Sequence, residues 1–202
     1  LGRDLLPALK DHDVTPLTRA EFDVTDHARA KAVLLDLRPE AILNTTAYHR
    51  VDECENRPQL AYEVNALAVL NLARLANETG AVLVHLSTDY VFDGNARTPY
   101  TEQSRPFPLS VYGNSKLAGE FLLRSVAKKY FLVRSCGLYG KAGSQGKGGN
   151  FVETMLERAR RGDSIRVVND QVVTPTYTVD LANQISLILC TEEYVIFHMT
   201  NE

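Results

Sequence analysis

Short apolar runs alternate along this chain with segments of helical periodicity, and this alternation constrains the fold more than any other feature. Three runs, at Ala41–Leu43, Ala81–Leu86 and Tyr130–Arg134, are apolar at successive positions instead of every second one. Strands of this kind are typical of parallel sheets that helices cover on both faces. We therefore expect an α/β fold with a doubly wound parallel sheet, and ligands at the carboxyl ends of its strands.

Helical patterns separate these runs. In the longest of them, Leu67 is expected to share a buried face with Leu60 and Val64. Two further strands are expected, at His12–Leu17 and Tyr194–Met199. The expected helices cover Arg3–Lys10, Ala28–Leu37, Pro58–Asn77, Val111–Ala127, Phe151–Arg161 and Asp180–Leu189.

The composition is that of a globular chain, and its charge and apolar runs argue against two classes of partner. Of the 202 residues, 45% are hydrophobic and 23% are charged, and the net charge is −3. This charge gives no strong positive field, so nucleic acid is not an expected partner. No apolar run approaches the ~18 residues of a membrane span, so no membrane partner is expected. The separated cysteines Cys54, Cys136 and Cys190 show no C-x-x-C spacing, which favours a reducing, cytoplasmic location.

Tyr112 and Lys116 are the first candidates for chemistry. Positions i and i+4 of a helix lie on one face, so the phenol and the ammonium can point into the same cleft. A neighbouring lysine cation lowers the pKa of a phenol and makes it a usable acid or base near neutral pH. The spacing alone is as compatible with a tyrosine packed on a lysine stem.

Ser87–Tyr90 directly follow the expected strand Ala81–Leu86, so their hydroxyls would point into the crevice at the strand end. Taken alone, this segment is better explained as a Ser/Thr turn. The order of strand, Ser-Thr and a later Tyr-x-x-x-Lys is more specific than either part. This combination therefore favours a catalytic site.

Two other segments suit a bound nucleotide. Small residues in Asn44–Tyr48, after the strand Ala41–Leu43, would let a nucleotide approach the backbone closely. Gly2 opens the first expected helix, where exposed N–H groups and the helix dipole suit a phosphate. A plain polar loop explains the first segment as well, and a single glycine is weak support.

Several segments together resemble the dTDP-4-dehydrorhamnose reductase family of the extended short-chain dehydrogenase/reductase superfamily. They are Ser87–Gly94 (STDYVFDG), Val111–Glu120 (VYGNSKLAGE), Asn169–Gln171 with Pro175-Thr176, Asn44–Ala47 with Val51-Asp52, and Asn150-Phe151. The resemblance covers almost the whole chain. It implies that a first strand and two glycines of a G-x-x-G-x-x-G precede Leu1, and that more of a substrate-binding region follows Glu202.

The same resemblance implies the domain organisation. Residues 1–140 would form a Rossmann-like NAD(P)-binding domain without its first strand. Residues 141–202 would form a mixed region that contributes to substrate binding and to the last sheet strands, and whose C-terminal part is missing. The glycine-rich segment Gly140–Gly149 is expected to be mobile.

By resemblance, the chain is an NAD(P)H-dependent reductase of a nucleotide-linked 4-keto-6-deoxy sugar, converting dTDP-4-dehydrorhamnose to dTDP-rhamnose. Tyr112 would donate a proton to the sugar C4 oxygen as hydride arrives from NADPH or NADH. Lys116 would hold the nicotinamide ribose and tune Tyr112, and Thr88 would hydrogen-bond the reacting oxygen.

The resemblance also implies binding roles. Asn65 is expected to support the site through water. The residues expected at the cofactor are Gly2, Asp23, Val24, Thr45, Thr46, Ala47, Tyr112 and Lys116. The residues expected at the nucleotide-sugar substrate are Thr88, Asp89, Tyr90, Gly137 and Asn150.

The chain departs from the family pattern in two places. The segment Arg134–Gly140 lacks the bulky aromatic that is frequent there, and the chain has no Trp. By resemblance, some family members form a magnesium-bridged dimer that uses acidic residues, one of them near the Pro-Thr motif. Pro175–Val179 carries no acidic residue at that place. No metal site is therefore predicted, and a homodimer stays open.

Two alternatives remain beside the reductase. One is a nucleotide-sugar epimerase or dehydratase of the same superfamily, although a dehydratase should carry Asp-Glu where Thr88 is followed by Asp89-Tyr90. The other is a non-catalytic subunit similar to the regulatory subunit of methionine adenosyltransferase. Turnover of a keto sugar nucleotide would distinguish an enzyme from that subunit.

Overall fold

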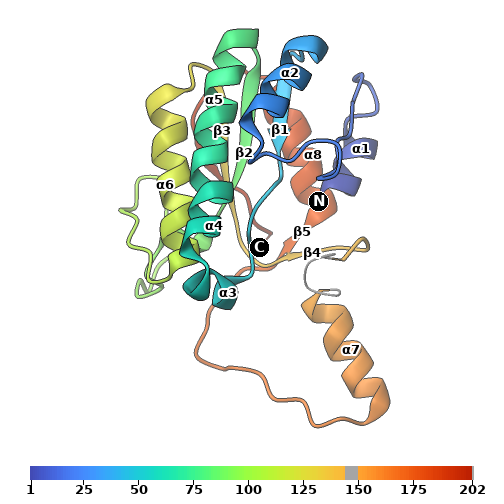
Figure 1. Cartoon of the computed structure of the whole chain (residues 1–202). Helices are drawn as coiled ribbons and strands as arrows, with labels where there is room; N and C mark the ends of the chain where they lie inside the picture. The colour runs from blue at the N-terminus through green and yellow to red at the C-terminus, as the bar shows by residue number, and fades with distance from the viewer. Residues whose placement is uncertain (144–149, 202) are drawn as a thin grey trace.

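A parallel sheet forms the centre of the computed structural model, which describes residues 1–143 and 150–201. Within these residues, its four strands run in the order β1-β2-β3-β6 (Figure 1). A separate two-stranded parallel sheet pairs β4 with β5. The strands are β1 (Ala41–Asn44), β2 (Val82–Thr88), β3 (Tyr130–Ser135), β4 (Leu138–Tyr139), β5 (Thr176–Tyr177) and β6 (Ile196–His198).

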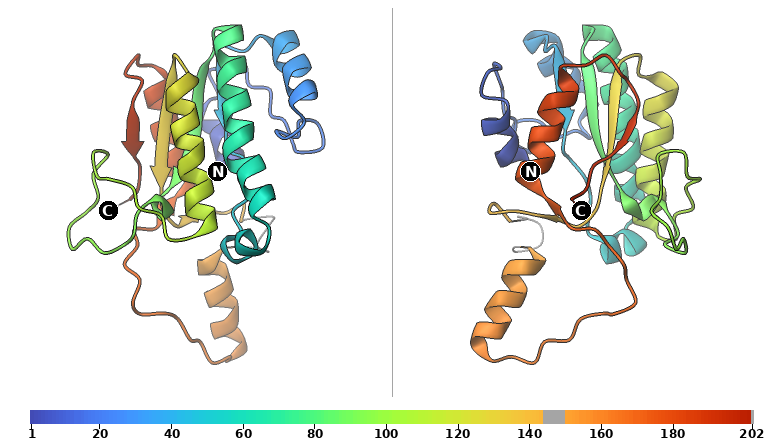
Figure 2. Two further views of the ribbon diagram at one scale, coloured as in Figure 1. Left: turned by 60° about the vertical axis from the view of Figure 1, so that its left-hand side comes forward. Right: turned by 180° about the vertical axis from the view of Figure 1, so that it is seen from behind.

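Helices cover both faces of the main sheet. Helices α2, α5 and α6 lie on one face, and α1 and α8 lie on the other (Figures 1 and 2). The doubly wound α/β fold predicted from the apolar runs is therefore confirmed. The helices are α1 (Gly2–Ala8), α2 (His27–Leu37), α3 (Val51–Asn56), α4 (Pro58–Tyr62), α5 (Ala68–Thr79), α6 (Val111–Val126), α7 (Phe151–Arg161) and α8 (Thr178–Leu189), with a π-helical segment η1 (Glu63–Leu67) and a 3-10 turn η2 (Asp89–Val91).

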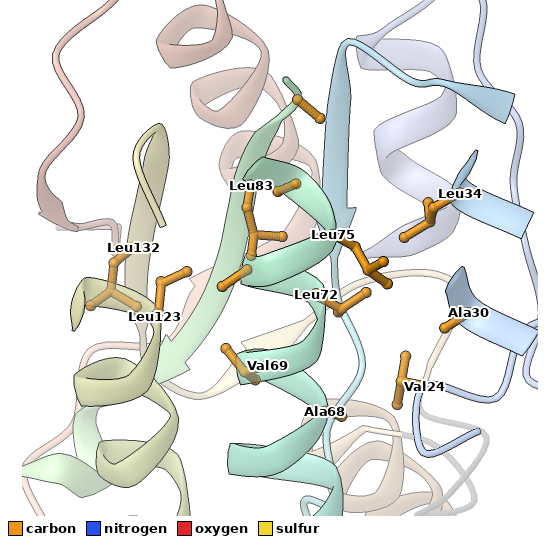
Figure 3. Close-up of a cluster of buried hydrophobic side chains, with 13 residues drawn as sticks. Val24, Ala30, Leu34, Ala68, Val69, Leu72, Leu75, Leu83, Leu123 and Leu132 are labelled. Carbon is orange, nitrogen blue, oxygen red and sulfur yellow. The ribbon is translucent and has the colours of Figure 1, made fainter. Parts of the chain in front are cut away.

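Strand β2 shows why its sequence is apolar without alternation. Leu83 packs into the cluster with Leu72 of α5 and Leu123 of α6, as Figure 3 shows. Val84 and Leu86 pack into the other cluster, with side chains of α1 and α8. Because successive strand residues point to opposite faces, a strand covered on both sides needs apolar side chains at nearly every position.

The long expected helix from Pro58 is helical to Thr79 but contains the π-helical segment η1. The extra residue of a π turn shifts the positions that follow around the helix axis. The prediction that Leu67 shares the buried face is therefore wrong, because Leu67 is 47% exposed while Asn65 and Ala66 point inward. A periodicity count from sequence assumes an unbroken α-helix and misses this shift.

The expected strand His12–Leu17 is also wrong, because this segment has no regular secondary structure and its Val14 and Leu17 are exposed. Pro16 has no N–H to donate to a neighbouring strand, which disfavours pairing there. The expected strand Tyr194–Met199 is found as the shorter β6 beside β3. The expected mobility of Gly140–Gly149 falls mostly on residues 144–149, which lie outside the described residues.

Helix α7 lies apart from the two helical layers, and an extended segment leads from it back to β5 (Figures 1 and 2). Asn150 caps its start by accepting a hydrogen bond from the N–H of Glu153, and Gly162 ends it with a φ of 73°. None of its side chains is buried within the described part of the chain. The division into domains at residue 140 stays a prediction.

Candidate active site

The carboxyl end of β2 and the start of α6 bring Thr88 and Tyr112 together. Ser110 caps α6 by accepting a hydrogen bond from the N–H of Gly113, at 3.1 Å. A Cβ at Gly113 would lie 2.3 Å from the backbone oxygen of Tyr90, so a glycine is required for α6 to approach η2 this closely. The Tyr112 side chain consequently lies in the crevice at the strand end and is 8% exposed.

The Tyr112 phenol is in its protonated form at neutral pH. Burial raises its pKa to about 12, although its hydrogen bond with Thr88 acts in the opposite direction. The sequence-based expectation that Lys116 lowers this pKa does not hold in this arrangement. Burial dominates the pKa of Tyr112, and the Lys116 ammonium donates to the backbone oxygen of Leu86, at 2.6 Å.

Lys116 is 1% exposed, one turn after Tyr112 on α6. Its Nζ lies 3.4 Å from Nε2 of His85 in β2. Burial lowers the pKa of Lys116 to about 8, while the Glu120 carboxylate on the next turn raises it. The lysine thus lies beside His85 and Leu86 of β2, two to three residues before the strand ends, in a setting that stabilises its charge poorly.

Asp89 and Tyr90 border Tyr112. The Asp89 carboxylate accepts hydrogen bonds from the Thr88 hydroxyl, at 3.0 Å, and from the Cys136 thiol, at 2.9 Å. Burial and this carboxylate raise the pKa of Cys136 to about 12, so the thiol stays protonated and acts as a donor. The Tyr90 ring meets the Tyr112 ring edge-on, with centroids 5.5 Å apart.

The loop after β1 lies next to the start of α1. A Cβ at Gly2 would lie 3.9 Å from Oγ1 of Thr45, so these two predicted cofactor residues are neighbours. Thr46 donates from its N–H and its hydroxyl to Oδ1 of Asn44, at 3.1 and 2.6 Å. Together with Ala47, which follows in the same loop, they lie at the edge of the sheet that the sequence assigns to a dinucleotide.

Asn65 joins this loop to α6 directly. Its side chain accepts from the N–H of Tyr48, at 2.9 Å, and donates to the backbone oxygen of Tyr48 and to the Ser115 hydroxyl, both at 3.0 Å. Asn65 is held by these direct contacts, and its expected support of the site through water stays a prediction. The π-helical turn explains the contacts, because it directs Asn65 inward.

The other predicted cofactor residues have local partners. Val24 packs in the hydrophobic cluster with Ala30 and Leu34. The hydrogen bonds of Thr25 to Asp23 lower the pKa of the Asp23 carboxyl. Both residues precede α2, and their role beside an adenine stays a prediction.

Gly137 and Asn150 lie around the small β4–β5 sheet. The backbone oxygen of Gly137 accepts from the N–H of Thr176, at 3.2 Å, and Asn150 donates to the backbone oxygen of Gly140, at 3.0 Å. Their substrate-binding role stays a prediction. Asn150 borders a cavity of about 190 Å³ whose other lining residues are Tyr139, Gly140, Lys141, Val152, Glu153 and Tyr177.

Sequence reasoning missed a buried ion pair behind the site. Glu120 of α6 accepts from Arg134 of β3 through both oxygens, at 2.9 and 2.6 Å. Ser87, which precedes Thr88, also donates to Glu120, at 2.5 Å. The signal was present, since Glu120 follows Tyr112 and Lys116 at the same four-residue spacing and would share their helix face.

Neither a metal centre nor a membrane span is found in the described ranges. Residues 1–143 and 150–201 contain no group of three or more His, Cys, Asp or Glu side chains placed to hold a metal ion. No helix in these ranges is both long enough and apolar enough to cross a membrane.

The whole chain, residues 1–202, matches the family model described as the RmlD substrate binding domain. The dTDP-4-dehydrorhamnose reductase of Streptomyces griseus is 38% identical over 209 residues, covering 100% of this chain and 67% of that protein. The spore coat polysaccharide biosynthesis protein SpsK of Bacillus subtilis (strain 168) is 36% identical over 203 residues, covering 100% of this chain and 70% of that protein.

Solved structures agree with these relatives. The dTDP-4-dehydrorhamnose reductase of Bacillus anthracis, solved in complex with NADP, superposes with a TM-score of 0.94 at 37% identity. The superposition covers 100% of this chain and 70% of that one. The family, the oxidoreductase class and the nicotinamide cofactor expected from the sequence agree with these proteins.

Proposed function

We propose, on the premise that this chain belongs to the dTDP-4-dehydrorhamnose reductase family, that it reduces dTDP-4-dehydrorhamnose to dTDP-rhamnose with NADPH or NADH. One observation carries the proposal: a buried, protonated Tyr112 lies near the Thr88 hydroxyl at the carboxyl end of β2, close enough for Thr88 to influence its pKa. Two hydroxyl groups in this position can both reach one carbonyl oxygen of a substrate.

The residues present fit a nicotinamide dinucleotide. Gly2 and Thr45 are adjacent at one strand end, where a small residue and a hydroxyl leave room for a phosphate. The Lys116 ammonium lies beside the next strand, β2, and would hold the ribose, whose hydroxyls supply acceptors. When bound, the nicotinamide supplies the hydride.

Tyr112 and Thr88 perform the protein's part of the reduction. As hydride adds to C4, the carbonyl oxygen becomes negative. The Thr88 hydroxyl, which donates to Asp89 in this structure, would turn to this oxygen and stabilise its charge by donating a hydrogen bond. Tyr112 donates its phenolic proton to the same oxygen, so the ketone becomes an alcohol. The pKa of about 12 keeps this proton on Tyr112 until the oxygen becomes basic.

The test is NADPH consumption by the full-length protein with dTDP-4-dehydrorhamnose. Tyr112→Phe should lower kcat at least about 100-fold, since positioned acid–base groups contribute about 10²–10⁴-fold. Tyr62→Phe, at a partly exposed tyrosine of α4, is the matched control and should keep the full rate. A full rate for Tyr112→Phe would refute its role as proton donor.

The same assay separates the alternatives. An epimerase returns its cofactor to the starting state, so it would convert the sugar without net consumption of NADPH. A wild-type protein that binds NADPH but leaves the keto sugar unchanged would instead favour the non-catalytic regulatory subunit.

A further inference from the structure

His85 is a fully buried histidine in the middle of the apolar strand β2, and the proposed mechanism does not use it. It points to the same side of the sheet as Leu83, two residues earlier, which is the side covered by α5 and α6. Its two ring nitrogens meet Asn44 of β1 and Lys116 of α6. The imidazole therefore connects the loop after β1 to the lysine.

The contacts of Asn44 decide which ring nitrogen of His85 carries the proton. The backbone N–H of Thr46 can only donate, so the Asn44 atom that faces it is the oxygen Oδ1. The amide nitrogen Nδ2 of Asn44 consequently faces Nδ1 of His85, at 3.1 Å, and donates to it. A neutral imidazole that accepts at Nδ1 carries its proton on Nε2.

The imidazole is neutral in this setting. Burial, and secondly the charge of Lys116, lower the pKa of His85 well below its usual range. Its Nε2–H then points at the Lys116 Nζ, 3.4 Å away, and offers the ammonium no acceptor. Two other groups interact with that ammonium: the backbone oxygen of Leu86 accepts a hydrogen bond from it, and the negative charge of the Glu120 carboxylate raises its pKa.

We propose that Asn44 and His85 are positioning residues for Lys116, in which Asn44 fixes the Nε2–H form of His85 so that the imidazole cannot capture the ammonium. The ammonium then remains available to the ribose hydroxyls of the dinucleotide. This inference rests on the proposed function, since it takes Lys116 as the residue that holds the cofactor. Contacts run from Thr46 through Asn44 and His85 to Lys116. The position of the loop after β1 is therefore linked to that of the lysine.

The first test is ¹⁵N NMR of the His85 ring in the full-length protein. We expect a protonated Nε2 and an unprotonated Nδ1 across the neutral pH range. A proton on Nδ1 in the wild type would overturn the inference. This measurement needs neither turnover nor a variant that folds.

The second test is Asn44→Ala, which removes the donor to Nδ1. The proton of His85 should then move to Nδ1, because Nε2 can accept a charge-assisted hydrogen bond from Lys116. His85 would compete with the ribose, and the Kd for NADPH should rise about 10-fold or more, the value of a hydrogen bond to a charged group. A changed tautomer with an unchanged Kd would overturn the positioning role.

The matched control is Asn77→Ala, which removes a different structural amide. Asn77 donates to the backbone oxygen of Val126 and accepts from the N–H of Lys128, away from Lys116. It should lower stability while leaving the His85 tautomer and the Kd for NADPH unchanged. A wild-type protein that does not bind NADPH would contradict the proposed function, and the tautomer would still be decided independently.

Discussion

Helices α6 and α7 begin in the same way but have opposite surroundings. Ser110 caps α6 and Asn150 caps α7, each by accepting from an N–H three residues later. Yet α6 lies beside the main sheet, whereas α7 lies apart from it (Figure 1). Tyr112, Lys116 and other side chains of α6 are buried, whereas α7 buries none within the described residues. A capping side chain is therefore sufficient to start a helix, but it does not by itself produce a buried site.

The close approach of α6 depends on two glycines. A Cβ at Gly113 would lie 2.3 Å from the backbone oxygen of Tyr90, and one at Gly119 would lie 2.1 Å from that of Asn65. Any other residue would force α6 away from η1 and η2. Lys116 and Glu120, on the same helix as Tyr112, are both buried.

The largest expected difference between the two helices concerns their ion pairs. Arg134→Met removes the bidentate cationic partner of the buried Glu120 carboxylate and leaves it the Ser87 hydroxyl as donor, which should lower the free energy of unfolding by about 3–5 kcal/mol. Arg161→Met removes the partner of Glu157 on α7, an exposed pair, and should change it by about 0.5 kcal/mol or less. Urea unfolding of both variants measures the difference.

Equal losses of unfolding free energy in the two arginine variants would contradict this difference between α6 and α7. They would mean either that Glu120 gains other partners or that the α7 pair is shielded from solvent in the full-length protein.

A second difference concerns leucines of the same two helices. Leu123→Ala on α6 creates a cavity in the core and should cost about 2–5 kcal/mol of unfolding free energy. Leu156→Ala on α7, where the leucine is 50% exposed, should change it by about 0.5 kcal/mol or less. Thermal or urea unfolding checks both, and a large loss for Leu156→Ala would indicate that α7 is covered.

A third expected effect is the pH dependence that comes from Lys116. Its pKa is about 8 when folded, against 10.5 for an ordinary lysine, so between these values the unfolded chain binds more protons. The free energy of unfolding therefore rises with pH in this window, by at most about 3 kcal/mol. Tyr112 acts oppositely above about pH 10, because its pKa is about 12 when folded.

The Lys116→Met variant tests this contribution. Urea unfolding near pH 8 and near pH 10 should show the rise in the wild type and a smaller rise in the variant. An identical rise in both would mean that the ammonium of Lys116 is not destabilised by burial.

Much of the candidate site could be predicted because its residues belong to short sequence motifs. Thr88, Tyr112 and Lys116 follow from one strand end and one helical spacing, and the structure brings Thr88 and Tyr112 together. The direction of the Lys116 ammonium could not be predicted, because Leu86 and His85 reach it from another element. The pKa of Tyr112 was expected to be lowered by Lys116, whereas burial raises it.

The fold, like the site, could be predicted from the sequence only in part. Successive apolar residues predicted a parallel sheet covered on both faces, and β1, β2 and β3 are found at the expected places. The exposure of Leu67 could not be predicted, since a π-helical turn depends on contacts of the whole helix. The same turn directs Asn65 toward Tyr48 and Ser115.

The sequence by itself determined the α/β class, the family and the residues proposed for proton transfer, because these depend on periodicity and on motifs within a few tens of residues. The tertiary structure alone decided the partners of the buried charges. Glu120 meets Arg134, and Lys116 meets Leu86 and His85, only after α6 has packed on the sheet. Burial and hydrogen bonding set the protonation of such groups, and both depend on the assembled core.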